Sequence, residues 1–90
     1  MIENKVLVSI NVPSLEQKYD VYVPVNRRIY SVINMFKSSL FELSLGSFDM
    51  NKEYVLYNAL TGAVYDMNAL VRNTDIRNGS NIILLWGGDN

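Results

Sequence analysis

The chain has 90 residues, of which 49% are hydrophobic and 19% charged, and its formal net charge is −1. These values predict one folded domain with a substantial core and exclude an intrinsically disordered chain. The only adjacent basic pair is Arg27–Arg28. The basic stripe that a nucleic-acid-binding protein needs is therefore missing, and we expect no nucleic-acid partner.

The sequence contains no cysteine and no histidine. It therefore offers no disulfide framework, no thiolate nucleophile and no histidine to bind a metal or act as a general base. No other titratable residues are spaced to shift one another's pKa, so we expect no enzyme activity, no cofactor and no metal. The sequence also has no apolar signal core and no apolar run near the ~20 residues that span a bilayer. We expect a cytoplasmic protein without membrane insertion.

Alternating residues predict a β-hairpin at the start of the chain. Every second residue from Lys5 to Val12 is branched and apolar, so these residues share one face of a strand. The same alternation recurs from Tyr19 to Val25. Pro13 to Lys18 supplies the turn between the two strands. Pro24 cannot donate a ladder hydrogen bond, so we expect it at the end of the second strand or at a sheet edge.

The next stretch predicts an amphipathic α-helix from Ile29 to Leu40. Its apolar residues follow one another at steps of three, one, three and four, which puts them on one stripe. Asn26 is the expected N-cap. Arg27 and Arg28 lie beside the free N–H groups of the first turn, where they form either an anion site or, by the plainer interpretation, a solvated pair.

Beyond the helix, Phe41 to Lys52 is expected to be a connecting loop. We expect Leu43, Leu45 and Phe48 to plug the lower end of the core. Asp49-Met50-Asn51 contains two oxygen ligands, which are too few for a cation site, so this segment is expected to form a turn.

Residues rich in β-propensity predict a third strand over Glu53 to Asn58. A turn with Gly62 at a positive φ leads to a short returning strand, Ala63 to Asp66. The segment after it is expected to be a loop or a short helical turn that buries Leu70 and Val71.

The last strand is predicted over Asn81 to Trp86, after a turn at Asn78-Gly79. From Ile82 onward its residues are apolar without alternation, and a strand that is apolar on both faces is usually central.

Together these elements predict an α+β fold. One main helix packs on one face of a mixed sheet of four to five strands, and the first and last strands are neighbours. This is the β-grasp arrangement. The predicted core consists of Val6, Val8, Ile10, Val21, Val23, Ile29, Val32, Ile33, Phe36, Leu40, Leu56, Leu70, Ile76, Ile82 and Leu84.

A family resemblance rests on three parts of the chain. They are Tyr19 to Pro24, which ends in a Val-Pro step, the helix with the loop Phe48 to Asn51, and the stretch from Leu70 through Ile76 to Leu85. In these parts the chain resembles the EsaB/YukD family, the small ubiquitin-like component of bacterial type VII secretion systems. The resemblance implies one ubiquitin-like domain over residues 1–90, with its core at about 4–86. It also implies a non-catalytic cytosolic accessory or regulator whose partners are cytosolic parts of the secretion membrane components.

Gly87-Gly88 raises an alternative, a ubiquitin-like modifier or sulfur carrier, because such proteins end in an exposed Gly-Gly. Here Asp89 and Asn90 follow, so a protease would first have to remove them. The glycines also come directly after Trp86, and at ~3.3 Å per residue they extend less than about 7 Å from the strand. The favoured interpretation is a chain end without this role.

The sheet face opposite the helix is the candidate functional surface. Adjoining apolar groups in water usually mark an interface, although single exposed apolar residues are normal. A one-residue slip in Tyr54–Tyr57 would exchange the two faces of that strand. We hypothesise that this face binds a partner protein or a second copy of the chain. The residues concerned are Leu7, Tyr22, Val55, Tyr57, Ile83, Leu85 and, at the edge, Trp86.

Overall fold

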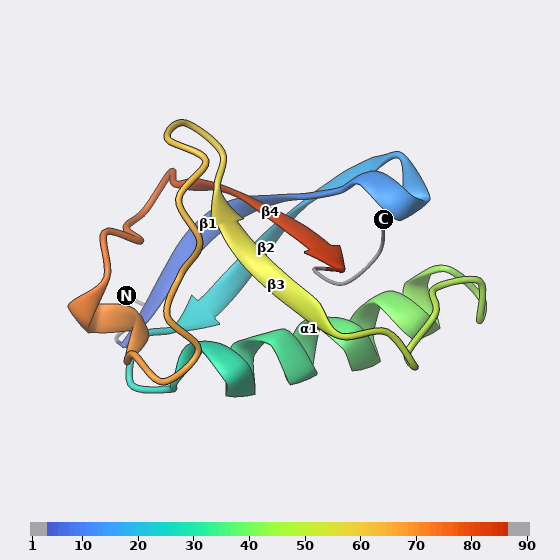
Figure 1. Cartoon of the computed structure of the whole chain (residues 1–90), viewed down its shortest axis with the longest axis horizontal. Helices are drawn as coiled ribbons and strands as arrows, with labels where there is room; N and C mark the ends of the chain where they lie inside the picture. Colours follow the sequence, from blue (N-terminus) through green and yellow to red (C-terminus); the bar gives the residue numbers. More distant parts are fainter. Residues whose placement is uncertain (1–3, 87–90) are drawn as a thin grey trace.

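The computed structural model describes residues 4–86 and shows one sheet with one α-helix packed across it (Figure 1). The strands are β1 (Lys5–Val12), β2 (Gln17–Pro24), β3 (Tyr54–Asn58) and β4 (Asn81–Trp86), and the helix is α1 (Ile29–Leu43). The order across the sheet is β2-β1-β4-β3. The predicted β-grasp arrangement is confirmed, with four strands in the sheet. Gly87-Gly88 lies outside the described residues.

β4 is a central strand, as its apolar sequence predicts. It pairs parallel with β1, where Ile82 lies opposite Ile10, and antiparallel with β3, where Leu84 lies opposite Leu56. Ile82 and Leu84 face the helix and are buried, while Leu85 faces the other side of the sheet and is partly exposed. The sequence of β4 does not alternate because both of its faces carry apolar side chains.

The predicted returning strand Ala63 to Asp66 is wrong, because only an isolated bridge forms there between Val64 and Tyr57. On either side of it, the Tyr65 N–H donates to the Leu56 carbonyl at 2.9 Å and the Asn58 N–H donates to the Ala63 carbonyl at 2.9 Å. Tyr65 then turns its ring into the core, which draws the chain away from β3. This segment still covers part of the outer edge of β3.

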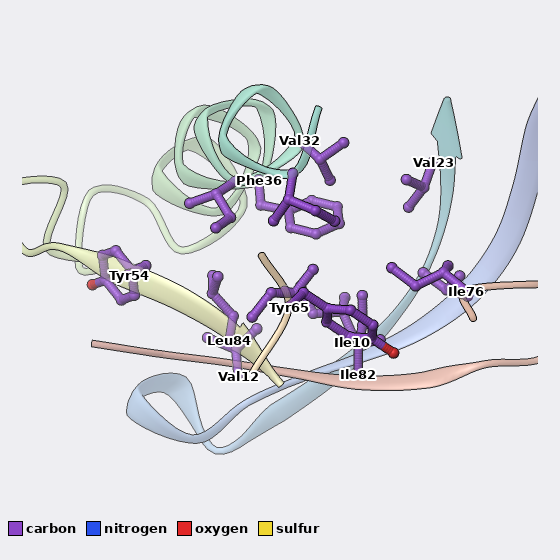
Figure 2. Packing of buried hydrophobic residues seen from close by; sticks show 14 of the residues in the cluster. Ile10, Val12, Val23, Val32, Phe36, Tyr54, Tyr65, Ile76, Ile82 and Leu84 are labelled. Atoms are coloured by element: carbon purple, nitrogen blue, oxygen red, sulfur yellow. The ribbon is translucent and has the colours of Figure 1, made fainter. Parts of the chain in front are cut away.

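The core lies between α1 and the sheet. In Figure 2, Val32 and Phe36 of the helix point toward Ile10 and Leu84 of the sheet. Most of the predicted core residues are buried, but three at the margin of this layer, Val6, Val21 and Leu70, are only partly buried. The core also contains Val12, Phe48, Tyr54, Tyr65 and Val71.

The start of α1 differs from the prediction. The N-cap is Arg28, without a side-chain capping bond, and not Asn26. Backbone carbonyls of the loop before η2 (Val71–Asn73) take over this role, because the Ile29 N–H donates to Ala69 at 2.9 Å and the Tyr30 N–H to Met67 at 3.0 Å. These N–H groups are therefore occupied, and the anion site considered for this position is not formed.

The end of α1 also differs, since the helix runs on to Leu43. It closes in a Schellman motif, in which the Gly46 N–H donates to Phe41 at 2.8 Å and the Leu45 N–H to Glu42 at 3.1 Å. The motif requires a left-handed residue, and Leu45 takes that place with φ of 55°. Leu43 and Leu45 are consequently turned outward, 61% and 95% exposed, and do not plug the core.

Phe48 does plug the lower end of the core, as predicted. Its ring is buried and stacks on Tyr54 with the centroids 4.8 Å apart. The segment after it forms the expected turn, because the Asn51 N–H donates to the Asp49 side chain at 2.8 Å.

We predict that Leu45→Gly stabilises the fold. A left-handed backbone costs a branched residue about 1–2 kcal/mol, and the exposed Leu45 side chain has little packing to lose. Part of this gain is offset by the greater chain entropy of glycine when unfolded. Urea denaturation should show a free energy of unfolding up to about 1 kcal/mol higher.

The matched control is Leu43→Gly, two residues earlier in the last helical turn. Glycine there should lower the free energy of unfolding by about 0.5–1 kcal/mol, because the helical backbone needs no positive φ. Equal destabilisation by both variants would contradict a strained Leu45.

Candidate protein-interaction surface

The sheet face opposite α1, here called the back face, is set by the pairing of the strands. Leu7 lies opposite Tyr22 across β1 and β2, and both side chains point away from the helix. On β3, Tyr54 and Leu56 are buried, so Val55 and Tyr57 between them face the back. The predicted orientation of this strand is therefore the one observed.

Four apolar side chains of the back face adjoin one another across β3 and β4. Val55 lies opposite Leu85, and Tyr57 lies opposite Ile83. Leu85 is 37% exposed and the other three are partly buried. Directly opposite residues of an antiparallel pair bring their side chains into contact, so these four form one apolar cluster, the β3–β4 cluster.

Leu7 and Tyr22 form a separate apolar pair at the opposite end of the back face, 39% and 50% exposed. Polar residues separate this pair from the β3–β4 cluster: Ser9 lies opposite Asp20, and Asn11 lies between Lys18 and Ile83. The seven predicted site residues therefore do not form one continuous patch. The cause is the offset of the parallel β1–β4 pairing, which sets Ile83 beside Asn11 and away from Leu7.

Trp86 does not lie on the back face, so its predicted place at the edge of this face is wrong. It follows Leu85 in the strand, so its side chain points to the helix side, where it lies opposite Tyr54. The two rings meet edge to face with centroids 6.3 Å apart, and the Lys52 ammonium lies 4.6 Å from the indole centroid. Trp86 thus packs against the margin of the core.

A hollow that the sequence pattern does not predict lies in the middle of the back face, with a volume of about 250 Å³. It is lined mainly by polar side chains of β1, β2 and β4 and bordered by Leu60. Leu60 is 86% exposed and is held by its N–H, which donates to the Asn58 side chain at 2.8 Å. No local pattern could place Leu60 there, because its position depends on how the loop after β3 folds back.

Outside the back face, the Asp75 side chain joins two other polar side chains. It accepts a hydrogen bond from the Tyr65 hydroxyl at 2.7 Å and another from the Asn58 side chain at 2.9 Å. Burial, followed by the bond to Asp75, raises the pKa of Tyr65 well above its ordinary value of 10.0. Burial and the nearby Asp49 also raise the pKa of Tyr54. These bonds tie the long loop between β3 and β4 to the sheet and set up no acid–base pair.

Two further findings concern the described residues 4–86. No group of three or more acidic side chains is placed to hold a metal ion. No helix in this part of the chain combines the length and apolarity needed to cross a membrane.

Comparison with known proteins finds likeness in structure only. No family model and no curated protein matches the sequence. Among solved structures, the ubiquitin-like domain of EccD5 from Mycobacterium xenopi aligns with a TM-score of 0.72 at 15% identity, covering 96% of this chain and 98% of that one. The ubiquitin-like domain of the Mycobacterium tuberculosis type VII secretion protein EccD1 aligns with a TM-score of 0.69 at 16% identity, covering 90% and 97%.

A third structure is the MycP5-free ESX-5 inner membrane complex. One of its chains aligns with a TM-score of 0.70 at 15% identity over 97% of this chain and 22% of that chain. At these identities the likeness establishes the fold. The protein has the ubiquitin-like β-grasp fold, and domains with this fold in mycobacterial type VII secretion proteins are among its structural neighbours.

We predict that Tyr65→Phe flattens the loss of stability at alkaline pH. The folded state holds the phenolic proton more tightly than the unfolded state does, because the pKa of Tyr65 is raised. Its contribution is therefore fully present below about pH 10 and is lost as the pH rises toward the folded-state pKa. Urea unfolding at several values between about pH 8 and pH 11 should show a shallower decline for the variant.

At neutral pH the same variant should lose about 1 kcal/mol, the usual contribution of one hydrogen bond. Tyr30→Phe, on the exposed side of α1, is the control for removing one tyrosine hydroxyl. Parallel pH curves for Tyr65→Phe and the unaltered protein would show that the pKa of Tyr65 is not raised in the folded state.

Proposed function

We propose that the protein is a non-catalytic, cytosolic accessory of a bacterial type VII secretion system that works by binding other proteins. The proposal is carried by a whole-domain likeness. This chain and the ubiquitin-like domains of EccD5 and EccD1 cover one another almost completely. The segments that resemble the EsaB/YukD family favour the same class, and this resemblance rests on the sequence alone.

Within residues 4–86, the titratable side chains are not arranged as a catalytic site, and this supports a binding role. Among the described residues, the two tyrosines with a raised pKa are engaged in holding loops, and the buried side chains are all hydrophobic. Neither feature provides a nucleophile or a general base in an open site.

The β3–β4 cluster is the proposed docking centre. It combines an aromatic ring, Tyr57, with three adjoining aliphatic side chains, and aromatic residues are enriched at the energetic centres of interfaces. Leu7 and Tyr22, at the other end of the back face, are proposed as a second contact. The proposed partners are cytosolic parts of the membrane components of the secretion system.

We predict that Ile83→Asp combined with Tyr57→Ser abolishes partner binding while changing the free energy of unfolding by no more than about 1 kcal/mol. A charge in the β3–β4 cluster would be desolvated in the complex without a partner. The measurement is co-purification of the type VII membrane ATPase with the tagged chain in its native host, together with secretion in a deletion strain complemented by each variant.

The matched control is Leu45→Asp combined with Tyr30→Ser. It makes the same two kinds of substitution at exposed apolar positions outside the back face, and it should retain partner binding and secretion. A large loss of stability in the test variant would identify Ile83 and Tyr57 as core residues. Unimpaired secretion by a well-folded test variant would exclude the β3–β4 cluster as the docking centre.

Intact-mass measurement of the protein from its native host separates this proposal from the modifier alternative. We expect a mass that retains Asp89 and Asn90. A species ending at Gly88, a thiocarboxylate or a conjugate to another protein would instead support a modifier or sulfur carrier.

A further inference from the structure

The two borders of the sheet differ in how their backbone groups are occupied. At β3, the outward-facing Leu56 carbonyl and Asn58 N–H are bonded to Tyr65 and Ala63. At β2, no segment among residues 4–86 pairs with the outer side of the strand. The outer side of β2, here called the β2 edge, is thus an open row of hydrogen-bonding groups.

The bonds made by β1 identify which groups are open. The Leu7 carbonyl accepts from Gly79, and the Ser9 N–H donates to Ser80, so these residues direct their backbone toward β4. Their opposite residues in β2 are Tyr22 and Asp20. In an antiparallel pair, opposite residues bond together or not at all. Tyr22, Asp20 and likewise Lys18 therefore point their N–H and C=O groups outward.

An apolar groove lies beside the β2 edge, between β2 and α1, with a volume of about 90 Å³. Tyr19 and Val21 form its β2 side, and Met35 and Leu43 form its α1 side. Met35 is 41% exposed and Leu43 is 61% exposed. A strand added to the β2 edge would place its alternate side chains against this groove, which is how strand addition gains its specificity.

We propose that the β2 edge binds the β2 edge of a second copy of this chain, in antiparallel register about a two-fold axis at Tyr19. Charge complementarity selects both the occupant and the register. With the axis at Tyr19, Lys18 of each copy lies opposite Asp20 of the other, and both residues point to the back face. The opposite charges then pair twice by symmetry.

Other registers lose this match. An axis at Asp20 or at Lys18 sets like charges directly opposite each other. An axis at Val21 sets Asp20 opposite Tyr22 and leaves Lys18 opposite Pro24, which has no N–H to donate. The two charges of β2 are spaced so that only the Tyr19 register joins them across the dimer.

The proposed dimer also uses the helix side of the strand. The two Tyr19 side chains meet at the axis as a pair without direct backbone bonds, the arrangement in which opposite side chains approach most closely. Lys18 and Asp20 supply the backbone hydrogen bonds on either side of it. Because exposed ion pairs contribute little affinity but strongly disfavour mismatched charges, they set the register and the partner.

The test is a pair of charge reversals, Lys18→Asp and Asp20→Lys, studied by sedimentation equilibrium on the full chain. The unaltered protein should dimerise with rising concentration. Each single variant should raise the dissociation constant about tenfold or more, because like charges then meet twice. An equimolar mixture of the two variants should dimerise again, since one chain then has an acidic edge and the other a basic edge.

The control is Glu53→Lys, which makes an equivalent change of charge away from the β2 edge and should leave the dissociation constant unchanged. Amide hydrogen exchange should show protection of Lys18 and Asp20 that grows with concentration, while Tyr22 beyond the paired stretch gains none. A chain that stays monomeric at millimolar concentration would overturn the proposal. So would a dimer that the single reversals do not weaken, or single variants whose mixture fails to associate.

This inference does not rest on the proposed function. The β2 edge and the β3–β4 cluster lie at different parts of the sheet, and Ile83→Asp with Tyr57→Ser should leave dimerisation intact. Loss of secretion and loss of dimerisation can therefore be observed separately.

Discussion

The parallel pairing of β1 with β4 is the constraint on which the rest of the structure depends. It joins strands from the two ends of the chain, which lie more than sixty residues apart in sequence. Asn78-Gly79 extends the contact: the Asn78 side chain accepts from the Leu7 N–H at 2.8 Å, and the Gly79 N–H donates to the Leu7 carbonyl at 2.8 Å. Gly79 has φ of 87°, which its lack of a side chain permits. Without this junction, β4 would not be held in mid-sheet under α1.

The long connection between β3 and β4 does more than close a loop. Its carbonyls bind the first N–H groups of α1, Val71 and Ile76 fill the core, and Asp75 fastens the segment through Tyr65 and Asn58. An irregular segment of this length is stable because its backbone groups find partners in other elements. The helix, the sheet and the loop are therefore interdependent, as expected of a small single-core domain.

The regular elements could be predicted because they are local. Alternation in Lys5–Val12 and the stripe along α1 each depend on residues close in sequence, and the predicted placement of β4 in mid-sheet followed from its apolar faces. The errors concern features fixed by distant contacts. Asn26 does not cap the helix, because the Ala69 and Met67 carbonyls accept from its first N–H groups. The strand predicted around Tyr65 does not form, because the Tyr65 ring turns into the core and its hydroxyl donates to Asp75.

The candidate surface likewise combines features that local alternation predicts with features that distant contacts determine. Alternation placed Val55, Tyr57, Ile83 and Leu85 on one face, as observed. It could not reveal that Ser9 and Asp20 separate them from Leu7, because the offset between β1 and β4 is set by the Asn78-Gly79 turn. Trp86 lies on the helix side because the alternation that governs Leu84 and Leu85 continues to the end of the strand.

Covering one sheet border with residues 63–65 has a consequence for how copies of the chain can assemble. At this border the Leu56 carbonyl and the Asn58 N–H are already bonded to Tyr65 and Ala63, so the longer row of open backbone groups is the β2 edge. A chain with one long open strand edge favours closure into a pair over the successive addition of further copies.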